Sequence, residues 1–184
     1  MKIIREKSTN QVIFQGNDLV LSESGVHGKG WRSSNTKPDN YELLEVTTIP
    51  HDFQGRHYTY SDGTWTRTET GLEIAKQKAK ERLAALRFKK ETGSLTLTSG
   101  AVINTERDSQ ALVTGAYTAS TINPDIVINW KGETGWIQIG ATEIRAIANA
   151  VTAHVQACFT REKELSELID IDPETDITTD WPEY

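Results

Sequence analysis

Apolar and polar residues alternate in short runs over the first 70 residues, which is the pattern of half-buried β-strands. The runs KIIRE (2–6) and QVIFQ (11–15) flank a KSTN turn, and DLVLS (18–22) and YELLEVTTI (41–49) follow as further strands. The run RHYTYSDGTWTRTE (56–69) predicts another hairpin, with its turn at Asp62-Gly63. Residues 23–40 are rich in turn formers and predict a long surface loop. We therefore expect a small β module over residues 1–70.

The hydrophobic period changes to three or four residues at Gly71. One apolar stripe on a helix is formed by Leu72, Ala75, Ala79, Leu83 and Leu86. Gly93 is well placed to end this helix. Two alternating runs, at 94–105 and 125–140, predict hairpins. Thr105 with Asp108 indicates the start of a helix after the first hairpin, and Thr142 is expected to cap a last helix that runs to about Ile169.

These elements predict an α+β fold, in which a small N-terminal β module is followed by a helix–hairpin–helix–hairpin–helix domain over residues 71–170. An isolated hairpin is marginally stable in water, so we expect both hairpins to share one small antiparallel sheet covered by helices. The second hairpin and the long last helix supply the expected core, namely Trp130, Trp136, Ile144, Ile147, Val151, Val155, Cys158 and Phe159. Trp130 and Trp136 are expected opposite or nearly opposite each other, as a structural clamp rather than a stacking platform.

An acidic tail is expected over residues 171–184. From Glu164 to Tyr184 the chain carries eight acidic residues and no basic one. The plain interpretation is disorder in the free chain. The alternative interpretation is a peptide that docks on a basic partner surface. Its expected contact residues are Trp181, Pro182 and Tyr184 as anchors, with the charges of Asp176 and Asp180 beside them.

Charge limits the possible partners. The 184-residue chain has a net charge of −6, which argues against binding nucleic acid through overall charge. The helix expected at 72–90 is basic, and its cations predict a solvated face, with pairing to the acidic tail as an alternative. A single cysteine excludes an intrachain disulfide, and the chain has neither a signal-peptide pattern nor an apolar run of the roughly 18 residues that span a bilayer.

Candidate chemistry is sparse. GVHGKG at 25–30 lacks the spacing and context of a phosphate loop. The spacing of His51, Asp52 and His57 matches no known metal-ligand frame. His154 and Cys158 lie four apart on the last helix, but Cys158 is in the apolar stripe, where a free cysteine behaves as a small hydrophobe. We expect no catalytic, metal or cofactor site and no enzymatic activity.

Several segments carry a resemblance to a known family. They are the helix that contains Arg82-Leu83, TERDSQ at 105–110, the W-K-x-x-x-G-W hairpin at 130–136 and A-V-x-A-H-V-Q-A-C-F at 150–159. Residues 71–170 resemble a family of domains of unknown function found at the C-terminal end of tailed-bacteriophage tail proteins and tail-fibre assembly proteins. The resemblance implies a place in tail or tail-fibre biology and supplies no catalytic residue.

The resemblance leads to an expected function. We expect a non-enzymatic virion structural protein of the tail, an adaptor or anchoring subunit that binds other tail or tail-fibre proteins. It would be assembled in the host cytoplasm and form homo-oligomers that follow the tail symmetry. One alternative is a tail-fibre assembly chaperone that the mature virion does not retain. Another is a carbohydrate-binding module, with stacking residues at Trp31, Trp65, Tyr58 and Tyr60.

Overall fold

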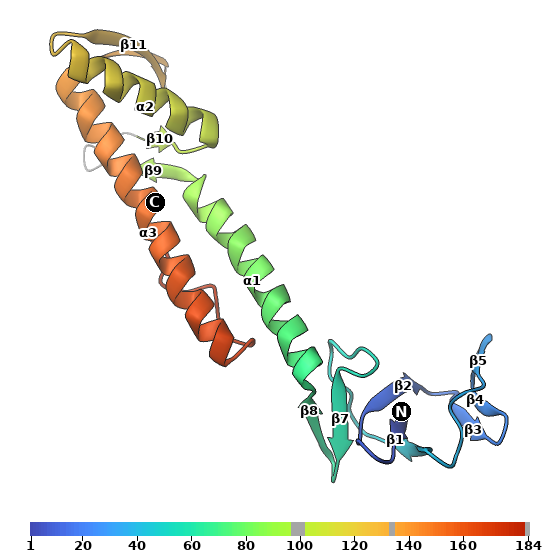
Figure 1. Cartoon of the computed structure of the whole chain (residues 1–184). Coiled ribbons are helices and arrows are strands. Elements are labelled where there is room, and N and C mark those ends of the chain that lie inside the picture. The colour runs from blue at the N-terminus through green and yellow to red at the C-terminus, as the bar shows by residue number, and fades with distance from the viewer. Residues whose placement is uncertain (97–101, 133–134, 183–184) are drawn as a thin grey trace. The chain divides into compact units, whose positions relative to one another are not determined.

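The computed structural model describes residues 1–96, 102–132 and 135–182 (Figure 1). The chain divides into two compact units, Met1–Gln77 and Lys78–Tyr184. The described residues form a mixed α and β protein with several small antiparallel sheets and three helices, of which the last, α3 (Ala141–Ile171), is the longest. The division between the units falls within helix α1 (Glu69–Glu91).

The first unit is built around a three-stranded antiparallel sheet with the order β2 (Val12–Gly16), β1 (Lys2–Glu6), β6 (Tyr41–Glu45). Neighbouring side chains of a strand point to opposite faces, and both Ile3 and Ile4 of the central strand are fully buried. Ile3 packs with one apolar cluster and Ile4 with another. The sheet is therefore covered on both faces, which explains how so small a unit obtains a core.

The prediction of a long surface loop at residues 23–40 is wrong in part. Strands β3 (Val20–Ser22), β4 (Gly25–Gly28) and β5 (Trp31–Ser33) form a second three-stranded antiparallel sheet. Val26 is fully buried in the cluster around Ile4. Gly25 has a φ of +111°, and a Cβ there would lie 2.0 Å from the Ser33 carbonyl oxygen. The turn formers therefore connect short strands that approach each other closely, and the strands are too short to show a sequence period.

The predicted hairpin at Asp62-Gly63 is present as β7 (Tyr58–Ser61) and β8 (Thr64–Arg67). Both turn residues have positive φ, +50° and +82°, as a two-residue type I′ turn requires. The Trp65 ring lies 4.9 Å from the Tyr60 ring and 5.8 Å from the Phe53 ring, between centroids. Its indole N–H donates to the Thr48 carbonyl at 3.1 Å. These aromatic side chains therefore pack on one another rather than form an open stacking surface.

A buried tyrosine ties this hairpin to the preceding loop. The Tyr58 hydroxyl donates to the Asp52 carboxylate at 2.5 Å, and Arg67 donates to the other oxygen of that carboxylate at 3.0 Å. Burial, followed by the bond to Asp52, raises the pKa of Tyr58 to about 12. Burial opposes ionisation of Asp52 as well, but the hydrogen bonds from Tyr58 and Arg67 outweigh it and lower the pKa of that carboxyl.

Alkaline pH is expected to destabilise the first unit through Tyr58. The folded state favours the protonated phenol, so this contribution is fully present below the unfolded pKa of 10.0 and is lost as pH rises towards about 12. The full loss is about 2–3 kcal/mol, since each pKa unit corresponds to about 1.4 kcal/mol. Denaturant unfolding of the wild type and of Tyr58→Phe between pH 9 and 12 measures it. A wild-type pH dependence equal to that of Tyr58→Phe would contradict the assignment, and Tyr117→Phe is the control.

The second unit contains two separate hairpins. β9 (Ser94–Thr96) pairs with β10 (Val102–Asn104), and β11 (Val127–Gly132) pairs with β12 (Gly135–Gly140). The expectation of one shared sheet is wrong for the described residues, because the two pairs form two two-stranded sheets. Their apolar side chains meet α2 (Arg107–Ile122) and α3 in one cluster, whose buried members are Ile103, Val113, Ala116, Ile139, Ile144, Ile147, Ala148 and Val151.

Both expected threonine caps are wrong. Thr105 is fully buried, and its hydroxyl donates to the Gly93 carbonyl, while α2 begins two residues later. Thr142 lies inside the first turn of α3. The Gly140 N–H that precedes this helix donates to the Glu143 carboxylate at 3.0 Å. The hydroxyl of Thr105 is therefore used to join the end of α1 to the start of α2.

Two of the eight expected core residues are exposed. Ile144, Ile147, Val151 and Cys158 are buried, and Trp130 and Val155 are partly buried against the cluster described above. The prediction is wrong for Trp136, which is 72% exposed, and for Phe159, which is 40% exposed. In the hairpin, Trp130 pairs with Ile137 and Trp136 pairs with Lys131. The two tryptophans therefore lie on opposite faces and form no clamp.

Candidate partner-binding site

The C-terminal segment 172–182 packs against its own helical unit. Trp181, an expected partner anchor, is only 8% exposed. Its indole N–H donates to the Ile177 carbonyl at 2.8 Å. Its ring packs in a cluster drawn from α1 and α3, whose other buried members are Ala79, Leu83, Cys158, Leu165 and Ile169. The segment is therefore ordered by one large apolar anchor, although its composition indicates disorder.

The charges expected to bind a partner lie on the outside of this segment. Asp180 pairs with Arg161 of α3 at 3.4 Å, and its side chain is 80% exposed. Asp176 accepts the N–H and hydroxyl of Thr178, at 2.9 and 2.7 Å, and these bonds lower the pKa of its carboxyl. Pro182 is half-buried, whereas Tyr184 lies outside the described residues. Asp180 thus pairs with α3, and α1 contributes apolar contacts to the segment.

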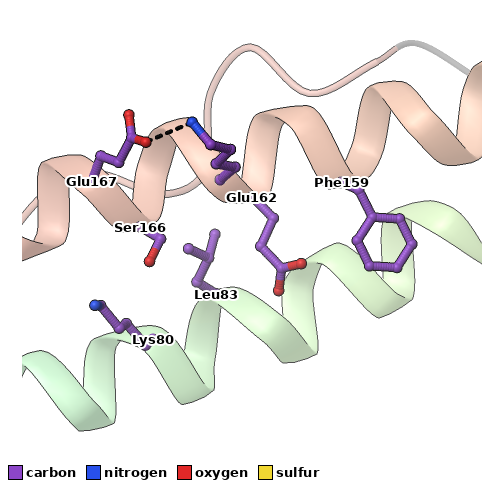
Figure 2. Close-up of a pocket in the computed structure, with 7 residues that line it drawn as sticks. Lys80, Leu83, Phe159, Glu162, Ser166 and Glu167 are labelled. Atoms are coloured by element: carbon purple, nitrogen blue, oxygen red, sulfur yellow. Dashed lines mark hydrogen bonds and ion pairs between the residues drawn. The ribbon is translucent and has the colours of Figure 1, made fainter.

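A groove lies between α1 and α3. Figure 2 shows its lining residues in front, while the C-terminal segment passes behind α3. Its volume is about 490 Å³, and its lining residues are Lys80, Leu83, Phe159, Glu162, Lys163, Ser166 and Glu167. The cations of the rim are paired, Lys163 with Glu167 and Lys80 with Asp170, both at 2.6 Å. The groove therefore offers an aromatic and aliphatic floor with a neutralised rim, which suits an apolar side chain better than a charged ligand.

A fully buried carboxylate joins the three helices. Glu91 accepts from Arg87 one turn earlier on α1 and from Arg107 of α2, whose terminal nitrogen lies 3.0 and 3.1 Å from its two oxygens. Arg87 also donates to Glu162 of α3 at 3.2 Å and lies 4.5 Å above the Phe159 ring. Phe159 is thus held beside the groove by a cation, which explains why it is half-exposed rather than in the core.

The Cys158–His154 pair has the setting of a structural group. Their side chains approach to 3.8 Å, and His154 Nε2 also lies 3.1 Å from the Lys90 carbonyl oxygen. Burial, with the nearby Glu91 carboxylate, raises the pKa of the Cys158 thiol. A nucleophilic cysteine needs the opposite, a lowered pKa in an accessible position. The geometry therefore gives this thiol a packing role.

The other candidate chemical residues are dispersed. Asp52 is engaged by Tyr58 and Arg67, and residues 25–28 of the glycine-rich segment form β4. Within the described ranges no group of three or more His, Cys, Asp or Glu side chains could hold a metal ion. The same residues contain no helix that is both long and apolar enough to cross a membrane.

The outer face of the β11–β12 hairpin carries two exposed apolar side chains that the sequence patterns did not single out. Trp136 is 72% exposed and Val127 is 61% exposed. Between them the Gln138 amide donates to Asn129 across the two strands at 3.2 Å. Val127, Asn129 and Lys131 alternate with the core-facing residues of β11 and therefore lie on this face. They pair across the hairpin with Gly140, Gln138 and Trp136, respectively. An exposed tryptophan is a residue type enriched at protein interfaces.

Comparison with known proteins gives one family match. The family model described as "Domain of unknown function (DUF4376)" matches residues 74–181, which include α1 beyond its first turn, both hairpins, α2, α3 and the packed C-terminal segment. No curated protein and no solved structure matches the chain. The family boundary at residue 181 includes Trp181, so the matched region extends to the anchor of the segment.

Proposed function

The chain belongs to the DUF4376 family, and from this premise we propose that it is a non-enzymatic structural protein of a bacteriophage tail. It would act as an adaptor or anchoring subunit that binds other tail or tail-fibre proteins and forms homo-oligomers that follow the tail symmetry. Residues 71–170, as a helix–hairpin–helix–hairpin–helix domain, would present the binding surface. The proposal places the protein in the virion tail after assembly in the host cytoplasm.

The observation that carries a binding role is the outer face of the β11–β12 hairpin, with Trp136 and Val127 exposed. Tryptophan is strongly enriched among the residues that dominate binding energy at protein interfaces. The hairpin is anchored from its other face by Ile128, Trp130 and Ile139, so it presents these side chains on a fixed backbone. The phage context is supported by the sequence resemblance of residues 71–170.

Quantitative mass spectrometry of purified particles tests this proposal. The chain should be present at a fixed ratio to a major tail protein. Supplied in trans to a phage that lacks the gene, Trp136→Ser should be incorporated at least about tenfold less than the wild type, because an interface anchor contributes about 2 kcal/mol or more. The matched control is Val20→Ser, which alters a 53% exposed apolar residue in the other unit and should be incorporated normally.

The same experiment separates the assembly-chaperone alternative. A chaperone would be absent from purified particles, while deletion of its gene would leave the fibre unfolded or unassembled. Absence from particles together with normal fibre assembly in the deletion strain would overturn both proposals. Normal incorporation of Trp136→Ser would show that the hairpin face is not the tail contact.

A further inference from the structure

The C-terminal segment and its docking face are complementary in shape and charge. Trp181 fills a site that both helices line, between Leu83 of α1 and Leu165 of α3. Ile177 adds a second, partly buried apolar contact four residues earlier. Arg161 donates to the Thr179 carbonyl at 3.3 Å and pairs with Asp180, next to the anchor. The face therefore recognises an acidic peptide with an isoleucine and a tryptophan four residues apart.

Besides these anchors the segment contains the buried Pro173, while several of its other side chains are exposed. The side chains of Asp176, Thr178, Thr179 and Asp180 are exposed. Several of its hydrogen bonds are local turns, such as those from Glu174 and Thr175 to Asp172. Local turns are kept when the segment leaves the helices. Release would therefore expose the apolar face of α1 and α3, and that face would need an occupant of the same chemistry.

Exposed apolar residues lie where the segment leaves α3. Leu168 is 46% exposed and Ile171, the last residue of the helix, is 82% exposed. When two copies exchange a terminal segment, the connections cross close to the two-fold axis and make a new contact there. Exchange at Asp172 would bring the Leu168 and Ile171 side chains of the two copies together and bury them. In the closed monomer these two side chains stay exposed.

We propose that the α1–α3 face binds the C-terminal segment of a second copy of this chain, with residues 172–182 exchanged reciprocally between the two copies. Trp181 makes the same contacts whether its segment binds the helices of its own chain or those of the second copy. The equilibrium between the closed monomer and the exchanged pair therefore depends on effective concentration. The closed monomer prevails in dilute solution, and the exchanged pair forms at high local concentration. This inference concerns contacts between copies of this chain and does not depend on the proposed place in a phage tail.

Crosslinking between two differently tagged, co-expressed full-length variants tests the exchange. One carries Arg161→Cys and the other Asp180→Cys, so a short bis-maleimide can join the two sites only if the segment of one chain lies on the helices of the other. Both chains also carry Cys158→Ala, because release of the segment would open the cluster that buries this native thiol. A chain with both introduced cysteines is the geometric control, because it crosslinks within itself when the segment is closed.

A crosslinked dimer above the level of either single variant is expected, with a yield that rises with protein concentration. Replacing Leu168 and Ile171 with serine in both chains should lower that yield by about tenfold or more, because the exchanged pair buries these side chains and the closed monomer leaves them exposed. No dimer from the mixture, while the double variant crosslinks within one chain at every concentration, would overturn the proposal. A dimer yield that is unchanged by these serine substitutions would overturn it as well.

Discussion

Replacing Trp181 with alanine is expected to lower the free energy of unfolding by about 3–5 kcal/mol, the usual cost of removing a large buried aromatic side chain. The loss is this large because one residue closes the apolar cluster between α1 and α3, where Cys158 and Ile169 are fully buried. For a unit of this size the melting temperature should fall by more than about 10 °C. Thermal and denaturant unfolding followed by circular dichroism measure the change.

The matched control for this substitution is Trp136→Ala. It removes the same side chain from a position that is 72% exposed, so the expected change in unfolding free energy is within about 0.5 kcal/mol. Similar melting temperatures for the two variants would mean that the C-terminal segment does not stabilise the helical unit. A large effect of Trp136→Ala alone would place that side chain in a stabilising contact.

Replacing Glu91 with glutamine is expected to cost about 3–5 kcal/mol, because removing one partner of a buried ion pair leaves the other charge uncompensated. Glu91 is fully buried and accepts from Arg87 and Arg107, which belong to different helices. The glutamine keeps the shape and one acceptor but not the negative charge. Guanidinium unfolding should show a lower midpoint, and urea unfolding at high and low salt should show the same loss, because a buried pair is poorly screened.

An exposed ion pair within α3 provides the comparison. Glu167 pairs with Lys163 at 2.6 Å, but their side chains are 65% and 76% exposed. Glu167→Gln is therefore expected to change the unfolding free energy by less than about 0.5 kcal/mol. If Glu91→Gln is equally mild, the Glu91 carboxylate does not hold the ends of α1 and α2 together, and the network has no structural role.

The helices and the longer strands follow from local periodicity, whereas the hairpin faces depend on register. A five-residue turn between Trp130 and Trp136 would set the tryptophans across from each other. In the structure Lys131 and Gly132 continue the strand, and Gly132 pairs with Gly135. A shift of one residue sends a side chain to the other face, so this small difference moves Trp136 from the expected core to the surface. The turn length could not be read from KGETG alone.

The C-terminal segment was unpredictable for a different reason. Its acidic, irregular sequence correctly describes residues that are exposed, such as Asp176 and Asp180. Its order depends on Trp181, whose binding site is assembled from α1 and α3, 82 residues apart along the chain at Leu83 and Leu165. Periodicity identifies an apolar stripe on each helix, but it does not identify which surfaces meet. The groove beside Phe159 is a product of the same long-range pairing.

The burial of the chain's only cysteine has a practical kinetic consequence. Cys158 lies beneath the C-terminal segment with no exposed surface, and its thiol has a raised pKa. A thiol reagent can therefore react with the native protein only when this region opens. The alkylation rate, compared with that of the unfolded chain, reports the free energy of that opening in the unmodified protein. The alkylation rate of Cys158 Sγ thus reports how often the C-terminal segment leaves helices α1 and α3.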